Sequence, residues 1–472
     1  MNKKLIDYLL SYFYFDEFIE SVTIVGSLEE KKISDVADID IVIVTKQLTK
    51  GLYQQIINHA NEIDLKSIGI DLKPKLNPTF GPLKFDEEDS LVLHLMIYDI
   101  ESHKQHVINS PFTCFDWERS NKYLGKKLED IFPVIQLLVK DFKVSRRGYD
   151  DYINDLENST ITYREYDFEG NTPVLVTKKF KINPQHITEF CFHIIFNTIN
   201  NSIKLIEKNN IKYFGNDFLL QWSNIFPDNY KIYHKFYKTL ENKKKNKHES
   251  NKLDIEQTKK FLKDFYHEVL SSHFTNEGLF IRHLETEMND GRFLGRIQDP
   301  DILKLNEKNN IQIEYCKENI SKFVSSPLKR CTQSMKSLGI EAFDTNEMLL
   351  EMDYGDADSL FIHEFESKYP TIISSWKNGE DESFPNGENY MMVQKRLSNF
   401  LESMENENCF IMTHQGVIRT FIGHNLKIDT NKWFLLQIPH LEPIHYLSIN
   451  NQYYVDIDRK LLYKIFSKYT EN

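Results

Sequence analysis

The chain has 472 residues, 40% of them hydrophobic and 13% aromatic, which gives it the length and composition of roughly two or three folded domains. Its formal net charge of −12 excludes a general nucleic-acid coat protein, although a local basic site is compatible with it. Five cysteines are scattered without Cys-x-x-Cys spacing, which favours a reducing compartment and no zinc site. No segment reads as a signal peptide or a membrane span, so we expect a cytoplasmic protein without a membrane partner.

The N-terminal part of the chain predicts a small sheet with two carboxylates at the start of a strand. Apolar residues at helical spacing predict a helix over 3–20, and short apolar runs predict strands at 22–25 and 38–44. The second strand begins with Asp38 and Asp40, which point to the same face because they are two residues apart. Two carboxylates in an apolar setting need a cation, and Mg²⁺ suits oxygen ligands and substrate phosphates.

A glycine turn precedes these carboxylates in the sequence. Gly26 and Ser27 offer a close backbone approach and hydrogen-bond donors to a triphosphate, and ten residues separate Ser27 from the Asp-x-Asp pair. This pattern resembles the polymerase-β-like nucleotidyltransferases. The resemblance implies a small mixed-sheet domain over residues 1–110 that transfers a nucleoside monophosphate from an NTP with two metal ions. It also implies a third carboxylate, for which Asp71 is our first choice and Asp99 the alternative.

The middle of the chain carries no motif. Residues 111–240 are predicted to be mostly helical, with one hairpin, and the resemblance implies a companion domain that holds the acceptor. Residues 241–275 begin with a lysine-rich polar run and are predicted to be a linker followed by a helix. Together with the C-terminal half, this predicts an α/β multidomain protein.

The C-terminal part, residues 276–472, places charged side chains after short apolar strands. Arg282 and His283 follow the first of these strands, Arg330 and His414 follow two later ones, and Glu351 lies in an apolar setting. Ligands of open α/β sheets bind at the carboxyl ends of the strands, where these groups could meet. Two guanidinium groups and one imidazole can neutralise a phosphoryl group, a second imidazole can accept it, and a carboxyl group can protonate the leaving oxygen.

Five segments of this half occur in the order of one known superfamily. They read RHLETEMNDGRFLGRIQDP, SSPLKR, LLEMDYG, PNGEN and THQGVIR, and they resemble the histidine phosphatase (phosphoglycerate-mutase-like) superfamily. The resemblance implies a three-layer α/β/α domain that needs no metal. It makes His283 the phosphoryl-accepting nucleophile and Glu351 the general acid and later base. The phosphate pocket would consist of Arg282, Arg330 and His414, with Asn289 as a supporting contact.

The chain departs from the superfamily pattern at a few positions. Leu284 replaces the usual glycine after the Arg-His pair, where a bulky side chain is expected to narrow the phosphate pocket. The later His-Gly-Gly is His414-Gln415-Gly416, and Met288 replaces a tryptophan. The compact version of the domain favours a phosphatase over a mutase.

Two catalytic modules on one chain suggest a bifunctional enzyme. The first hypothesis is small-molecule or sugar metabolism, with an NTP and a small phosphorylated substrate as partners. The alternative is a regulatory or defence module that nucleotidylates a protein or RNA. In that module the phosphatase half would process a phosphorylated end or a signal, or act only as a binding domain. The sequence does not identify the NTP, the acceptor, the phosphoester or the oligomeric state.

Overall fold

The computed structural model describes most of the chain. The described residues are 2–26, 28, 38–81, 90–110, 117, 120–134, 149–182, 184–209, 211–245, 252–266, 276–304, 320–449 and 452–469. They belong to two compact units, an N-terminal one that includes the first sheet and the helices up to residue 266, and a C-terminal one that begins at residue 276. The predicted α/β multidomain organisation agrees with this, while the boundaries at residues 110 and 240 stay predictions.

The N-terminal unit contains a five-stranded mixed sheet in the order β3-β4-β2-β1-β5. Its strands are β1 (Ile19–Val25), β2 (Asp38–Thr45), β3 (Lys73–Asn77), β4 (Ser90–Asp99) and β5 (Tyr123–Gly125). Strand β2 is central and apolar, runs antiparallel to β1 and lies parallel to β4. Helices α1 (Asn2–Phe13), α2 (Lys50–Asn61), α3 (Ile100–Asn109) and α5 (Leu128–Ile131) accompany the sheet. Helix α1 ends earlier than predicted because Oδ1 of Asp16 accepts a hydrogen bond from the amide of Phe18, 2.8 Å away, and forms a turn.

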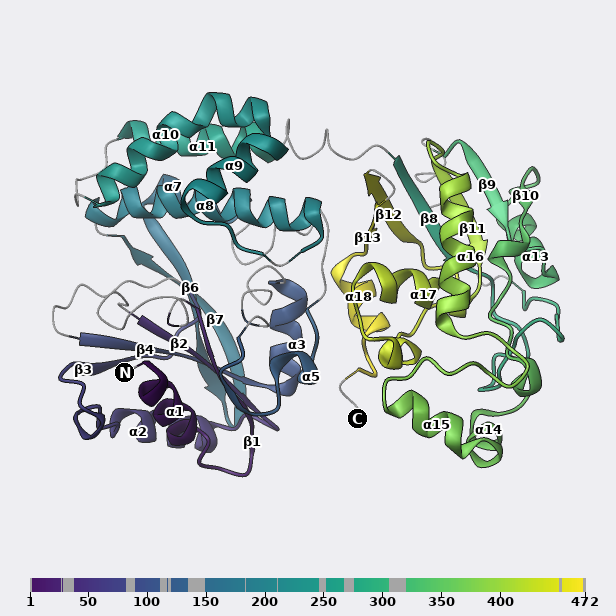
Figure 1. The fold of residues 1–472 in the computed structure, drawn as a ribbon, viewed down its shortest axis with the longest axis horizontal. Coiled ribbons are helices and arrows are strands. Elements are labelled where there is room, and N and C mark those ends of the chain that lie inside the picture. The colour runs from purple at the N-terminus through teal and green to yellow at the C-terminus, as the bar shows by residue number, and fades with distance from the viewer. Residues whose placement is uncertain are drawn as a thin grey trace. The chain divides into compact units, whose positions relative to one another are not determined.

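The rest of the N-terminal unit is helical with one long hairpin, as predicted. The helices are α7 (Tyr149–Asn158), α8 (Pro184–Glu207), α9 (Gly215–Ile225), α10 (Pro227–Lys245) and α11 (Lys252–Asp264). The hairpin consists of β6 (Thr160–Glu169) and β7 (Thr172–Lys181), and a bridge between Phe80 and Arg164 joins it to the first sheet (Figure 1). The predicted linker is shorter than expected, because α10 continues to Lys245. Lys243 pairs with Asp254 of α11 at 2.7 Å, so the two helices are held together.

The C-terminal unit is built on a six-stranded mixed sheet in the order β10-β9-β11-β8-β12-β13. The strands are β8 (Asn276–Arg282), β9 (Lys322–Ser325), β10 (Asp344–Thr345), β11 (Cys409–Thr413), β12 (Ile444–Ile449) and β13 (Gln452–Asp456). Strands β8, β11 and β9 are parallel neighbours, and the register pairs Thr413 with Arg282 and Met412 with Ser325. The carboxyl ends of these three strands therefore meet at one edge of the sheet.

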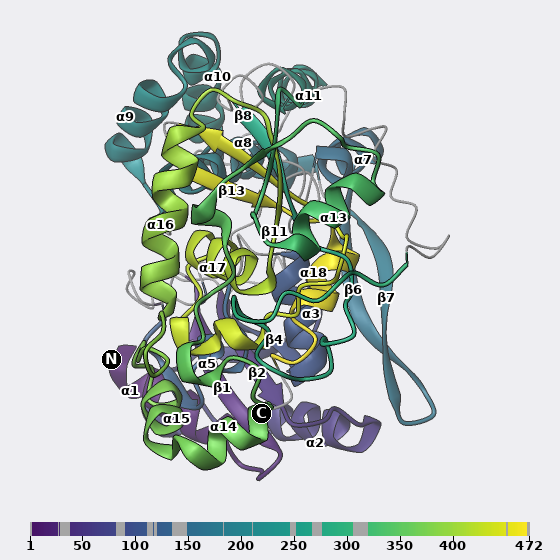
Figure 2. The ribbon, with the colours of Figure 1, turned by 90° about the vertical axis from the view of Figure 1, so that its right-hand side faces the viewer.

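Helices cover both faces of this sheet (Figure 2). Among the described residues, the helices of four residues or more in this unit are α13 (Lys329–Ser337), α14 (Ile362–Lys368), α15 (Pro370–Lys377), α16 (Tyr390–Ser403), α17 (Gln415–Asn425), η9 (Thr430–Leu435) and α18 (Arg459–Ile465). Leu279 and Ile281 of β8 share a buried cluster with Met335 of α13. Phe280, which points to the opposite face, contacts Phe421 of α17 with ring centroids 4.4 Å apart. The alternation along β8 thus explains why α13 and α17 lie on opposite sides, in the predicted three layers.

Candidate active site

The carboxyl-end edge of the C-terminal sheet brings together four of the predicted site residues. Arg282 and His283 come at the end of β8, His414 follows β11, and Arg330 lies in the first turn of α13. The rings of His283 and His414 have centroids 5.2 Å apart. Nε of Arg330 donates to Nδ1 of His414 at 3.3 Å, and the amide of His283 donates to the carbonyl of Thr413 at 3.0 Å. The parallel pairing of the strands therefore assembles groups that lie far apart in the sequence, with a separation of 84 residues between Arg330 and His414.

The ring of His283 is oriented by the backbone of the next residue. Nδ1 lies 2.6 Å from the carbonyl oxygen of Leu284, and because a carbonyl only accepts, Nδ1 carries the hydrogen. Burial lowers the pKa of His283 well below its usual value, and the positive charges of Arg282 and Arg330 lower it further. The ring is therefore neutral, with a lone pair on Nε2 that can attack phosphorus.

The two arginines of the predicted pocket differ in what they bind. Arg282 donates to the carbonyl of Ile438 at 2.7 Å, and its buried Nε has no hydrogen-bond partner among the described residues. Burial and the nearby charge of Arg419 lower the pKa of Arg282 to about 10. These features leave Arg282 with an unused donor and an unbalanced charge, as an anion-binding group requires.

Arg330 is fully buried and is largely occupied by the segment that precedes α13. It donates to the carbonyl oxygens of Gly295 (2.8 Å) and Gln298 (3.1 Å) and to Oδ1 of Asp299 (3.3 Å). Together with the bond to His414, these contacts use four of its five N–H groups. Arg330 therefore holds the pocket wall and offers a single remaining donor to a ligand.

Glu351 is held at the N-terminus of α17. Its Oε1 accepts hydrogen bonds from the amides of Met352 at 2.9 Å and Gly416 at 3.0 Å. A Cβ atom at Gly416 would lie 2.5 Å from Oε1, so a glycine is needed there. In the segment His414-Gln415-Gly416, the glycine therefore lets the carboxylate of Glu351 lie against the start of α17.

A partly buried ion cluster fixes the backbone around Glu351. Nε of Arg296 donates to the carbonyl oxygen of Glu351 at 2.7 Å, and the guanidinium of Arg396 reaches the same oxygen at 3.3 Å. Both arginines pair with Glu388, at 2.7 Å and 3.1 Å. Burial alone would raise the pKa of Glu388, but the charges of Arg396 and Arg296 and several hydrogen bonds outweigh it and lower the pKa. Glu388 is the glutamate of the PNGEN segment, so this cluster connects that segment to the backbone of Glu351.

Asn289 forms part of a local turn. Its Oδ1 accepts hydrogen bonds from the amide of Thr286 at 2.7 Å and from Oγ1 of Thr286 at 3.0 Å. The amide oxygen is thus used within the loop that follows β8. The predicted contact of Asn289 with phosphate would have to come from its nitrogen, and it stays a prediction.

Leu284 does not narrow the pocket as expected. Its side chain is buried in the cluster that also contains Cys331 and Met335, and its amide donates to Oγ of Ser334 at 2.8 Å. The bulky group is thus part of the core between β8 and α13, while the backbone keeps its place beside His283.

We expect Leu284→Gly to destabilise the C-terminal unit without increasing turnover. Removing a buried leucine side chain costs about 2–5 kcal/mol. Thermal melting and steady-state phosphate release would measure both effects, with Leu303→Gly, at a partly exposed position, as the control. A variant that melts like the wild type and turns over faster would show that Leu284 obstructs the pocket.

The site contains three further residues that the sequence patterns did not identify. Oγ of Ser326 lies 2.8 Å from Nε2 of His414, and Nδ1 of His440 donates to the carbonyl of His283 at 2.6 Å. Arg419 donates to the carbonyl of Leu436 at 2.7 Å and acts electrostatically on Arg282. The quoted SSPLKR and THQGVIR segments contain Ser326 and Arg419, whereas His440 lies in a loop with no pattern.

Two buried histidines of the site and one partly buried histidine predict acid sensitivity. Burial lowers the pKa of His440 to about 4 and the pKa values of His283 and His414 well below their usual range. In the unfolded chain each titrates near 6.5, so below that pH the unfolded state binds more protons and folding stability falls. Each histidine contributes a loss of about 1.4 kcal/mol per pH unit.

We therefore expect the free energy of unfolding of the C-terminal unit to drop steeply between pH 6 and 5. Denaturant titrations at several pH values would measure the slope. His440→Gln should reduce the slope of the free energy of unfolding against pH by the contribution of about one proton. Replacement of the exposed His363 should leave the slope unchanged. A free energy of unfolding that stays constant over this range would contradict the conclusion that the three histidine rings are neutral in the folded protein.

The N-terminal unit brings Gly26 and Asp40 together, as the sequence pattern requires. Gly26 ends the β1 region with a φ of +84°, and a Cβ atom there would lie 2.5 Å from Oδ2 of Asp40. Asp38 is exposed at the start of β2, whereas Ser27 lies outside the described residues. The neighbour of Asp40 on β4 is His94, whose Nδ1 lies 2.7 Å from Oδ1 of Asp40. Although burial lowers the pKa of His94, the hydrogen bond and charge of Asp40 raise it overall.

Neither candidate for the third carboxylate agrees with the structure. Asp71 precedes β3, its side chain is 91% exposed, and it pairs with Lys66 at 3.3 Å. Asp99 caps α3, where Oδ1 accepts a hydrogen bond from the amide of Ser102 at 2.7 Å. Within the described ranges, no group of three or more histidine, cysteine, aspartate or glutamate side chains could hold a metal ion. The predicted role of Asp71 therefore needs correction, because its segment is not a strand and does not reach the Asp-x-Asp pair.

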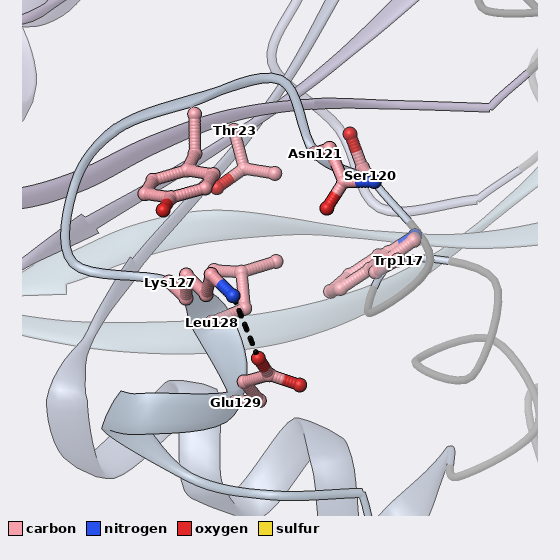
Figure 3. A pocket seen from close by; sticks show the side chains of 8 residues that line it. Thr23, Trp117, Ser120, Asn121, Lys127, Leu128 and Glu129 are labelled. Carbon is pink, nitrogen blue, oxygen red and sulfur yellow. Dashed lines mark hydrogen bonds and ion pairs between the residues drawn. The ribbon is translucent and has the colours of Figure 1, made fainter.

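The N-terminal unit contains a small pocket whose lining includes neither Gly26 nor the Asp-x-Asp pair (Figure 3). Its lining residues are Thr23, Trp117, Ser120, Asn121, Tyr123, Lys127, Leu128 and Glu129. Its lysine is paired with its glutamate at 3.3 Å, so the charges within the pocket already balance each other. We assign no ligand to it.

The C-terminal unit is an α/β domain in which two arginines and two histidines gather at the carboxyl edge of the sheet. Residues 279–454 match the family model of the histidine phosphatase superfamily (branch 1), and this part of the chain is a histidine phosphatase domain. The match confirms the family predicted for the C-terminal half. The family model does not extend to the N-terminal unit.

Solved structures similar to the chain belong to several organisms. A mycobacterial glucosyl-3-phosphoglycerate phosphatase shares 18% identity, covering 38% of this chain and 97% of that chain, with a TM-score of 0.33. A mutant phosphoserine phosphatase of Entamoeba histolytica shares 20% identity over 38% of this chain and 94% of that chain, with a TM-score of 0.33. A Thermus thermophilus protein shares 21% identity over 38% and 97%, with a TM-score of 0.31. No curated protein matches the chain significantly. Along the described parts of the chain, no helix has the length and apolarity to cross a membrane.

Proposed function

We propose that the C-terminal unit hydrolyses a small phosphate monoester through a phosphohistidine on Nε2 of His283. The observation that carries this proposal is the orientation of the His283 ring, whose Nδ1 is bound to a carbonyl and whose neutral Nε2 is left for attack. Nε2 bonds to phosphorus as the ester bond from phosphorus to the leaving oxygen breaks. Arg282 and Arg330 neutralise the phosphoryl oxygens during transfer.

Glu351 supplies and then recovers the proton of this cycle. In the first step its carboxyl group gives a proton to the leaving oxygen, so that an alcohol departs. In the second step the carboxylate takes a proton from a water molecule whose oxygen attacks phosphorus. The bond from phosphorus to Nε2 breaks, and inorganic phosphate and free His283 result. The backbone amides at Met352 and Gly416 keep the carboxylate in place for both steps.

For the N-terminal unit we propose a nucleotide site at Gly26, Asp38 and Asp40. The specific observation in its favour is the contact between the glycine turn and the Asp40 carboxylate, as the Gly-Ser-x10-Asp-x-Asp pattern demands. Transfer of a nucleoside monophosphate from an NTP and the use of Mg²⁺ stay predictions. Among the residues that the structure describes, no third carboxylate joins the pair in a group that could hold a metal ion.

With both sites active, the protein would be a bifunctional enzyme of small-molecule or sugar metabolism. The phosphatase half would act on a sugar or polyol phosphate, and the other half would attach a nucleotide. The alternative is a regulatory or defence module that nucleotidylates a protein or RNA. Labelling of a macromolecule by an NTP would favour the alternative, and turnover of small phosphates without such labelling would favour metabolism.

We expect the two sites to be separable by mutation. Wild type, His283→Ala and Asp38→Ala/Asp40→Ala would be tested with a panel of small phosphates and, separately, with labelled NTPs, Mg²⁺ and cell extract. His283→Ala should abolish only phosphate release, and the aspartate double variant should abolish only nucleotide incorporation. A wild type that releases no phosphate from any substrate would contradict the phosphatase proposal. Absence of any labelling would contradict the proposed nucleotide transfer by the N-terminal unit.

A further inference from the structure

Two arginines of the C-terminal unit, Arg282 and Arg419, are held by the same short segment of the chain. Nη1 of Arg282 donates to the carbonyl oxygen of Ile438, and Nε of Arg419 donates to the carbonyl oxygen of Leu436, each at 2.7 Å. The Cα atoms of Leu436 and Ile438 are at most about 7 Å apart, because only two residues of chain separate them. The segment therefore brings two positive side chains close to each other at the carboxyl edge of the sheet.

Helix α17 directs Arg419 toward the same edge. The helix begins directly after His414, and the amide of Gly416 in its first turn donates to Oε1 of Glu351 at 3.0 Å. Arg419 is three residues after Gly416 and therefore lies on the same face of the helix. Because side chains of a helix lean toward its N-terminus, the side chain of Arg419 extends back toward Glu351.

The electrostatic surroundings agree with this placement. Burial raises the pKa of Tyr354 well above its usual value, and the charge of Glu351 raises it further. The charges of Arg419 and Arg282 oppose this rise. Burial and the charge of Arg419 also lower the pKa of Arg282 to about 10. Arg282, Glu351 and Arg419 thus act on one phenol group and lie around the same small region.

The charges of the two arginines are not balanced by ion pairs. Among the residues that the structure describes, neither Arg282 nor Arg419 forms an ion pair with a carboxylate. Arg330, in contrast, pairs with Asp299 at 3.3 Å. Glu351 is uncharged in the proposed first step, because it carries the proton for the leaving oxygen. Two like charges held together at a partly buried edge repel each other, and an anion bound between them removes this cost.

We propose that Arg419 binds the phosphoryl group together with Arg282 and supplies the second positive charge of the pocket. This inference rests on the proposed phosphatase function and deepens it, since the sequence resemblance places Arg330 and not Arg419 in the pocket. A phosphate monoester carries a charge of about −1.5 to −2 at pH 7, which two guanidinium groups neutralise. The remaining N–H group of Arg330 adds a hydrogen bond to the same phosphoryl oxygens.

Binding of inorganic phosphate to the full chain, measured by titration calorimetry, tests this proposal without reference to turnover. Arg419→Gln keeps an N–H donor for the carbonyl of Leu436 but has no charge. We expect its Kd for phosphate to rise about 10- to 100-fold, as on loss of a hydrogen bond to a charged group. Arg419→Lys keeps the charge and should retain most of the affinity. If thermal melting shows that Arg419→Gln folds and it binds phosphate as tightly as the wild type, the proposal is overturned.

Arg292→Gln is the matched control. Its guanidinium group already pairs with Asp290 at 3.1 Å, so the variant should bind phosphate like the wild type. An equal loss of affinity in Arg292→Gln and Arg419→Gln would show that the net charge of the protein sets the affinity, which would overturn the role of Arg419.

A spectroscopic measurement on the wild type does not depend on how well Arg419→Gln folds. Phosphate should shift the Nε–H nuclear magnetic resonance signal of Arg419, identified as the signal missing from Arg419→Lys. Absence of a shift at saturating phosphate would overturn the proposal. A wild type that binds no phosphate would contradict the pocket and this inference together. A wild type that binds phosphate but releases none from esters would contradict only the proposed hydrolysis.

Discussion

Replacing His283 with alanine is expected to abolish phosphate release by the C-terminal unit. The imidazole is the only group we assign to form the bond with phosphorus, and loss of a nucleophile lowers turnover on the order of 10⁴-fold or more. Steady-state phosphate release from a small monoester would measure the loss. Because the ring is neutral and buried beside Arg282 and Arg330, an alanine also leaves these two charges in place. Binding of inorganic phosphate should therefore survive in the variant.

Two further measurements make this expectation specific. Rapid quenching under alkaline conditions with a radioactive phosphate ester should trap a labelled phosphohistidine in the wild type and none in His283→Ala. His363→Ala is the matched control, since this histidine is exposed on α14 and lies in none of the five motifs. Retention of the trapped intermediate in His283→Ala would move the nucleophile to another residue, with His414 as the first candidate.

Replacing Glu351 with glutamine is expected to lower turnover by an amount that depends on the leaving group. General acid catalysis contributes about 10²–10⁴-fold, and this contribution is lost for an alkyl phosphate, whose alkoxide is a poor leaving group. A p-nitrophenyl phosphate needs little protonation, so its turnover should fall much less. The ratio of the two turnover numbers, in wild type and variant, measures the role of the acid. Equal losses for both esters would show that Glu351 has a structural role instead.

Gly416→Ala provides an independent approach to the same carboxylate. The added Cβ would lie 2.5 Å from Oε1 of Glu351 and would displace it from the two backbone amides. The variant should thus show the same dependence on the leaving group while it retains Glu351. Gly51→Ala is the control, because its Cβ would meet only Oγ1 of Thr49, at 3.9 Å.

Much of the C-terminal site could be predicted from the sequence. Short apolar runs followed by Arg282-His283, by Arg330 and by His414 indicated strand ends, and parallel strands bring their carboxyl ends together. The effect of Leu284 could not be predicted, since whether a side chain faces the pocket or the core depends on the position of α13. His440 was not predicted either, because its bond to the carbonyl of His283 depends on how a loop without any pattern returns to β8.

In the N-terminal unit the sequence located the Asp-x-Asp strand and the glycine turn, and the structure brings Gly26 against Asp40. Asp71 was a reasonable choice for a third carboxylate only if its apolar surroundings formed a strand, and they do not. His94 was read as one residue of an apolar strand. Its partner lies 54 residues away, and nothing in the local pattern indicates which strand pairs with which.

By itself, the sequence determined the class of the C-terminal domain and the order of its motifs, and it predicted a nucleophile and an acid for the site. These follow from local patterns, since apolar runs, glycine turns and the residue types beside them are all read along the chain. The tertiary structure alone decided that Leu284 belongs to the core, that Arg330 is occupied by a loop, and that His94 lies beside Asp40. These facts depend on strand register and on packing between distant segments, which side-chain periodicity does not encode.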